Sequence, residues 1–149
     1  MEKEFSVDLI QFKLLDKLGE DNIAEIYQAT ENNRNQIFAA RIYQNPFKEE
    51  DQKAIKKLVT EGKDISNLNH PLIAKFVGIS QTDFKGDGKP VAITEFSTKG
   101  TLLNLFQSTR KGTSDIKFND TKKLITLYSI ASAMSFLHSH NVIHSHLQP

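Results

Sequence analysis

The stretch that decides the fold is residues 12–43, FKLLDKLGEDNIAEIYQATENNRNQIFAARIY. Successive side chains along residues 36–43 alternate between two faces, with apolar residues in both sets, which is typical of a strand. Residues 24–29 also alternate, and residues 12–14 begin a third run that leads to Gly19. The cluster at residues 31–35 is rich in Asn and favours a turn. The stretch therefore predicts three successive antiparallel strands.

The next segment predicts a helix and two more strands. Residues 49–68 begin with three acidic side chains, which suit the positive end of a helix dipole, and continue with apolar residues at helical spacing. Asn69-His70-Pro71 ends this helix. Residues 73–80 and 90–96 are strand-like, and residues 81–89 between them read as a hairpin loop. The pattern predicts an α+β fold with a five-stranded antiparallel sheet and one helix.

The remainder of the chain predicts helices. A connector at residues 97–100 precedes a short helix that contains Leu102 and Phe106, and residues 109–119 read as a polar loop. Asn119 or Asp120 can cap a long helix that ends near Leu137. No charged residue follows Lys123, but the apolar run is shorter than the about 20 residues that a membrane span needs. We therefore expect a buried helix.

Composition narrows the function classes. The 149 residues suit about one domain, and 38% hydrophobic with 25% charged residues is ordinary globular composition. The 19 Lys and Arg against 18 Asp and Glu give a formal charge of +1, which argues against a dedicated nucleic-acid or anionic-membrane binder. The absence of cysteine excludes disulfides and thiolate sites. The mixed-charge start MEKEFSVDLI does not resemble a signal peptide, so we expect a cytoplasmic protein.

Two opposite charges interrupt apolar patterns. Glu61 lies on the apolar face of the helix predicted for residues 49–68, and Arg41 lies in phase with Ile37 and Ala39 of its strand. A buried carboxylate needs a cationic partner, so Arg41 and Glu61 are predicted to form an ion pair. The alternative is that both side chains reach the rim and keep their charges in water.

Two weaker signals are Gly19 and the histidines near the end. Gly19 at a strand end suggests a turn over a ligand, but a phosphate-binding loop needs several glycines. Alternating histidines could bind a metal through neutral imidazoles, yet no carboxylate or cysteine accompanies them. We therefore predict no metal site. The histidines concerned are His138, His140, His144 and His146.

Seven motifs follow one another in an order and spacing similar to the first half of a protein kinase domain. They are Leu18-Gly19 through Glu25-Ile26, Phe38-Ala39-Ala40-Arg41, Glu61, Asn69-His70-Pro71-Leu72-Ile73, Ile93-Thr94-Glu95-Phe96, FLHSHNVI at 136–143 and HSHLQP at 144–149. The resemblance runs from about Phe12 to Pro149 and leans to the tyrosine-kinase-like branch. It implies an N-terminal extension at residues 1–10, a kinase-like N-lobe at 11–96, and a hinge with the D- and E-type helices of a truncated C-lobe at 97–149.

The resemblance also implies a nucleotide site. Arg41 stands at the position of the strand lysine, and Glu61 at that of the C-helix glutamate. Thr94, Glu95 and Phe96 are similar to the gatekeeper and hinge. The residues that the resemblance assigns to this site are Leu18, Gly19, Ile26, Ala39, Arg41, Glu61, Thr94, Glu95 and Phe96.

The departures from the family argue against catalysis. His146 stands where the family has the catalytic aspartate, and Gln148 where it has a lysine that contacts the transferred phosphoryl group. Asp21 and Ala24 replace two glycines of the loop, and Arg41 replaces the strand lysine. The chain contains no Asp-Phe-Gly to hold magnesium. We therefore expect ATP binding to be weak or absent, with no magnesium site in this chain.

Three interpretations remain. The first is a pseudokinase-type domain fragment that acts as a binding or scaffolding module. The second is the N-terminal part of a divergent ATP-dependent Ser/Thr or Tyr kinase, and the third is a degenerate gene product without function. The resemblance implies that the C-lobe helices that would bury the long apolar helix are missing from this chain, so this helix should expose a patch that self-associates or that a protein partner covers. The residues concerned are Leu124, Leu127, Ile130, Met134 and Leu137, of which the first four are the expected partner contacts.

Overall fold

The computed structural model describes residues 6–33, 36–44, 53, 67–144 and 147. The chain divides into two compact units, which we call the sheet unit and the helical unit. The sheet unit comprises Met1–Asn69 and Ala74–Phe96, and the helical unit comprises His70–Ile73 and Ser97–Pro149. Each unit is described by itself.

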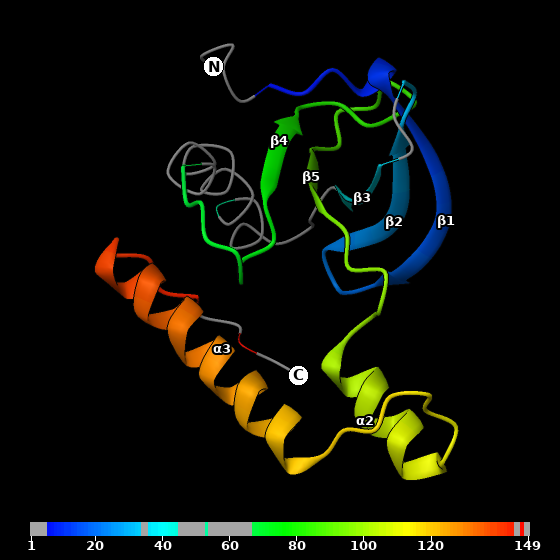
Figure 1. Cartoon of the computed structure of the whole chain (residues 1–149). Helices are drawn as coiled ribbons and strands as arrows, with labels where there is room; N and C mark the ends of the chain where they lie inside the picture. The colour runs from blue at the N-terminus through cyan, green and yellow to red at the C-terminus, as the bar shows by residue number, and fades with distance from the viewer. Residues whose placement is uncertain (1–5, 34–35, 45–52, 54–66, 145–146, 148–149) are drawn as a thin grey trace. The chain divides into compact units, whose positions relative to one another are not determined.

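The sheet unit contains five antiparallel strands (Figure 1). They are β1 (Phe12–Glu20), β2 (Ala24–Glu31), β3 (Ile37–Tyr43), β4 (Phe76–Ser80) and β5 (Val91–Glu95). Their order across the sheet is β1-β2-β3-β5-β4, so the third strand lies at the centre. The predicted five-stranded antiparallel sheet of an α+β fold is confirmed, with helices after it.

Alternation along the central strand explains why the sheet has two apolar faces. Phe38, Ala40 and Ile42 point to one face, where they pack with buried residues of β1, β2 and β5. The ring of Phe12 meets that of Phe38 edge to face, with 5.4 Å between the centroids. Tyr43 belongs to the other face, where the second buried cluster lies. Arg41 is in phase with Tyr43, and this places the cation on that second face.

The N-terminal extension contacts one edge of the sheet at Ile79. Ser6 forms a parallel bridge with Ile79 of β4, and the N–H of Val7 donates to the carbonyl of Ile79 at 3.1 Å. Because β4 is an outer strand, this contact satisfies backbone groups that could otherwise pair with another chain. The extension then enters the short 3₁₀ helix η2 (Leu9–Gln11), capped by Asp8, and continues into β1.

The helical unit contains α2 (Leu102–Lys111) and α3 (Asp120–Ser139). Thr101 caps α2 by accepting the N–H of Asn104, and Gly112 ends it with a positive φ of 68° that other residues rarely adopt. Asn119 caps α3 by accepting the N–H of Lys122 at 3.0 Å, one of the two predicted caps. Among the described residues, no helix is sufficiently long and apolar to cross a membrane.

Four predicted boundaries were wrong. The strand predicted from residue 73 begins at Phe76, because Ile73 closes a turn on the carbonyl of His70 at 3.0 Å. The strand predicted over 90–96 is shorter, spanning only Val91–Glu95. The loop predicted from residue 109 begins at Gly112, since α2 runs on to Lys111. Most of the helix predicted over 49–68 lies outside the described residues, but its end was placed too late, because Leu68 is not helical.

Candidate functional site

The turn between β1 and β2 is closed by the side chain of Asp21. Its Oδ1 accepts the backbone N–H groups of Ile23 at 3.0 Å and Ala24 at 2.9 Å. The N–H of Asp21 in turn donates to the carbonyl of Ala24 at 2.9 Å. Backbone N–H groups of a turn are the donors with which proteins hold anionic oxygens. Here two of those donors already hold a carboxylate of the chain itself.

Arg41 is the cation that faces this turn. It lies on β3, paired with Ile26 of β2 on one side and Ala92 of β5 on the other. Its Nη2 donates to Oδ2 of Asp21 in a close ion pair. The two oxygens of Asp21 therefore bind different partners, backbone donors through Oδ1 and the guanidinium through Oδ2.

Tyr43 packs beside the same guanidinium. The Cζ atom of Arg41 lies 5.6 Å from the ring centroid of Tyr43, within the range of a cation–π contact. Burial raises the pKa of the Tyr43 hydroxyl above its ordinary value. Among the described residues, Nε of Arg41 is buried without a hydrogen-bond partner. Among the described residues, the guanidinium is thus held by the ion pair with Asp21 and the cation–π contact with Tyr43.

The predicted ion pair of Arg41 with Glu61 is not tested, because Glu61 lies outside the described residues. The side chain of Arg41 is 38% exposed. Sequence reasoning recognised that Asp21 adds a charge near the loop but missed its pairing with Arg41. The missing information was the register that brings the β1–β2 turn to β3.

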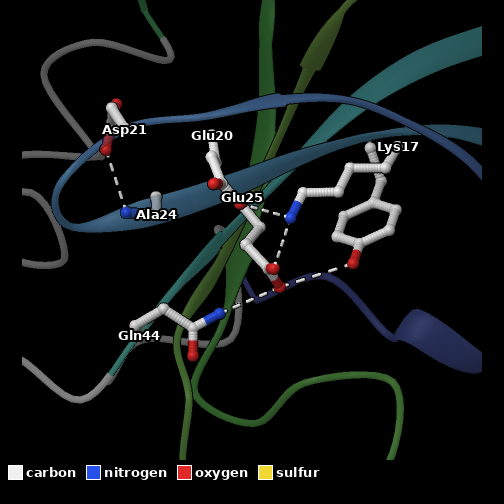
Figure 2. Close-up of polar contacts among 7 residues, drawn as sticks. Lys17, Glu20, Asp21, Ala24, Glu25 and Gln44 are labelled. Atoms are coloured by element: carbon white, nitrogen blue, oxygen red, sulfur yellow. Dashed lines mark hydrogen bonds and ion pairs between the residues drawn. The ribbon is translucent and has the colours of Figure 1, made fainter.

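A second ionic cluster fixes the strands on either side of the turn (Figure 2). Nζ of Lys17 on β1 contacts Glu20 at 2.5 Å and Oε1 of Glu25 on β2 at 2.6 Å. Figure 2 shows that the carboxylate of Glu25 also accepts from Gln44, at 3.0 Å. These contacts raise the pKa of Lys17, chiefly through Glu20, and Lys17 lowers the pKa of Glu25. The cluster links both strands to the end of β3.

The other residues assigned to a nucleotide site are distributed over the sheet unit. Leu18 is 46% exposed, and Ile26 and Ala39 are half-buried. Ala39 pairs with Thr94 of β5. A Cβ atom added at Gly19 would have no other atom within 4 Å, so neighbouring atoms leave space for a side chain at this position.

The strand that ends at the predicted hinge is anchored to its neighbour. The N–H of Glu95 donates to the carbonyl of Lys75 at 2.8 Å, and the carboxylate of Glu95 accepts the N–H of Lys75 at 3.1 Å. Phe96, the next residue, is half-buried. His146 and Gln148, which the sequence resemblance assigns to the positions of the catalytic aspartate and lysine, lie outside the described residues.

Comparisons with known proteins identify the family. The model of the protein kinase domain matches residues 12–149. The chain is 22% identical to the probable serine/threonine-protein kinase nek1 of Dictyostelium discoideum over 93% of its length, which is 27% of that protein. It is 29% identical to the tyrosine-protein kinase Abl of Drosophila melanogaster over 88% of its length, 7% of that protein. Aurora kinase B of the same fly is 26% identical over 93% of the chain, which spans 39% of that kinase.

The matched region begins with β1 and includes all five strands and both described helices. The chain spans well under half the length of each of these relatives. The relatives include both serine/threonine and tyrosine kinases. A sheet of this topology followed by helices agrees with the family match, and the chain therefore belongs to the protein kinase domain family.

Proposed function

We propose that this kinase domain fragment is catalytically impaired and acts as a pseudokinase-type binding module. The observation that carries the proposal is the position of Arg41. This residue stands where the family has its phosphate-binding lysine, and it is paired with Asp21. The backbone donors of Ile23 and Ala24 are occupied by the same carboxylate.

Electrostatics explains why this arrangement opposes a nucleotide. A triphosphate that approached Arg41 would have to displace the Asp21 carboxylate or lie beside its negative charge. A planar guanidinium also differs from the compact ammonium of lysine in how it contacts phosphates. Since phosphoryl transfer is largely positioning and charge stabilisation, His146 and Gln148 at catalytic positions weaken it further.

We also propose that the chain belongs to the tyrosine-kinase-like branch of the family and that the protein is located in the cytoplasm. The stretches Asn69-His70-Pro71 and Phe76-Val77-Gly78 favour the tyrosine-kinase-like branch. A cytoplasmic location agrees with the absence of cysteine from the sequence. Fractionation of cells that express the tagged chain tests the location, and recovery in a secreted or membrane fraction would contradict it.

A thermal-shift titration tests the nucleotide part of the proposal. The 149-residue chain is heated with ATP, either with excess magnesium or with a chelator. The expected result is no stabilisation that depends on magnesium, because Asp21 opposes the phosphates. A rise in melting temperature that saturates with Mg-ATP, and is absent with chelator, would refute it.

The second candidate is the N-terminal part of a divergent ATP-dependent protein kinase. It is favoured by the relatives, which are named as kinases and of which this chain covers 7% to 39%. Sequencing of the transcript beyond codon 149 discriminates the two candidates. An Asp-Phe-Gly motif further along would supply a magnesium ligand and support the kinase.

A further inference from the structure

A cleft in the sheet unit lies between the N-terminal extension and the loop that joins β4 to β5. Its volume is about 560 Å³, which is within the range of small-molecule sites. Residues 7–10 form one wall, and residues between Ser80 and Gly86 form the other. We call this space the extension–loop cleft. Its first wall precedes residues 12–149, the region that the kinase family model matches, so the family match assigns no role to the cleft.

Hydrogen bonds fix both walls of the cleft. Besides the pairing of the extension with β4, Asn32 donates its side-chain amide to the carbonyl of Ile10 at 2.7 Å and its backbone N–H to that of Gln11 at 2.8 Å. In the loop, the N–H of Asp83 donates to the carbonyl of Asp87 at 2.9 Å. The cleft is therefore formed before a ligand arrives, and this lowers the entropic cost of binding.

Asp83 brings a carboxylate to the cleft with one oxygen in use and one available. The residue is only 9% exposed, and its Oδ1 accepts the N–H groups of Lys85 and Asp87, both at 2.9 Å. Among the described residues, nothing donates to Oδ2. This oxygen is not sealed off, because Nε of Arg41 is the one buried polar side-chain atom in the described part of the chain that lacks a partner. A nearly buried carboxylate oxygen of this kind favours a cationic donor.

The lining of the cleft suits an organic cation. Two carboxylates, those of Asp8 and Asp83, and one ammonium, that of Lys85, give it a net negative charge. The described residues contain no cluster of three side chains that could hold a metal ion. Ile10, which is 83% exposed, and the half-buried ring of Phe84 offer apolar surface beside the carboxylates. A ligand with a charged end and an apolar body matches both features.

We propose that the extension–loop cleft binds a small organic ammonium ion with an aromatic body. The ammonium donates to Oδ2 of Asp83, and the aromatic body packs against Phe84 and Ile10. This inference goes beyond the proposed function, because the cleft contains no residue of the nucleotide-like site and its ligand carries no phosphate.

Fluorescence anisotropy with the 149-residue chain tests the inference, with tryptamine as the probe. The chain contains no tryptophan, so indole emission reports the ligand alone. Tryptamine should bind saturably with a Kd of about 1 mM or tighter. The neutral probe tryptophol, which has a hydroxyl in place of the ammonium, should bind about tenfold more weakly or not at all.

A matched pair of variants locates the ammonium. Asp83→Asn keeps an oxygen for the two backbone N–H groups and removes the charge, whereas Asp87→Asn removes the same charge from the same loop but outside the cleft lining. Asp83→Asn should weaken tryptamine binding about tenfold, and Asp87→Asn should leave it nearly unchanged. Ile10→Ser shortens the exposed apolar wall and should weaken binding of tryptamine about threefold.

Three results would overturn the inference. The absence of saturable tryptamine binding, or equal binding of tryptamine and tryptophol, would remove the ligand class. Equal loss in Asp83→Asn and Asp87→Asn would assign binding to the overall charge of the loop. Unchanged tryptamine binding in Ile10→Ser would remove the cleft, and this variant decides the matter if circular dichroism shows that Asp83→Asn does not fold.

Discussion

Replacing Asp21 should separate its two structural roles. Asp21→Asn keeps an oxygen that can accept the N–H groups of Ile23 and Ala24 but removes the charge that faces Arg41. The two side chains of the ion pair are 41% and 38% exposed, so solvent screens it and its contribution is roughly 0.2–1 kcal/mol. Asp21→Ala also removes the acceptor for both N–H groups. By analogy with a lost helix cap, it should cost about 1 kcal/mol more.

Urea unfolding of a double-mutant cycle measures the ion pair directly. The cycle combines Asp21→Asn with Arg41→Gln, each alone and together, at low and high salt. The expected coupling energy is roughly 0.2–1 kcal/mol at low salt, and it should fall at about 1 M salt, where the Debye length is about 3 Å. A coupling of zero at low salt would refute the pairing of Asp21 with Arg41.

Three further predictions concern other parts of the chain. The pair predicted from sequence between Arg41 and Glu61 implies that Arg41→Met destabilises more than the double change with Glu61→Leu, and additive effects on urea unfolding would contradict it. Lys17 lowers the pKa of Glu25 below its ordinary value of 4.5, so the stability that this contact contributes is present above about pH 4.5 and is lost as the pH falls. The free energy of unfolding should therefore decrease less steeply with falling pH in Glu25→Gln than in the wild-type chain. Identical pH dependence in the two proteins would contradict this. Gly112→Ala should lower stability by about 1 kcal/mol, since φ is 68° there, and an unchanged unfolding midpoint would count against the αL cap.

Local patterns predicted the sheet well because alternation and turn residues act within a few positions. The same reasoning failed where polar residues continue a helix. Thr109, Arg110 and Lys111 read as loop, but cations suit the negative end of a helix dipole, and Gly112 is the true end. The turn at Ile73 likewise depends on a backbone hydrogen bond from its N–H to the carbonyl of His70, and the pattern of apolar residues does not predict such a bond.

The candidate site was predictable only in part. Arg41 and Asp21 each departed from an expected pattern, so both could be singled out from the sequence. Their contact depends on strand register and on the conformation of the β1–β2 turn, in which Asp21 caps the N–H groups of two residues. The sequence instead predicted Glu61 as the partner of Arg41, because Glu61 is the other charge in an apolar stripe, and that prediction lies outside the described residues.

The affinity of ATP for the chain, measured by calorimetry, tests the central claim most directly. If Asp21 occupies the cation that would otherwise hold the phosphates, the wild-type chain should bind ATP weakly, and Asp21→Asn should bind it about fivefold or more tightly. The added change Arg41→Gln should abolish that gain. Tight magnesium-dependent binding by the wild-type chain, with no change in Asp21→Asn, would contradict the account.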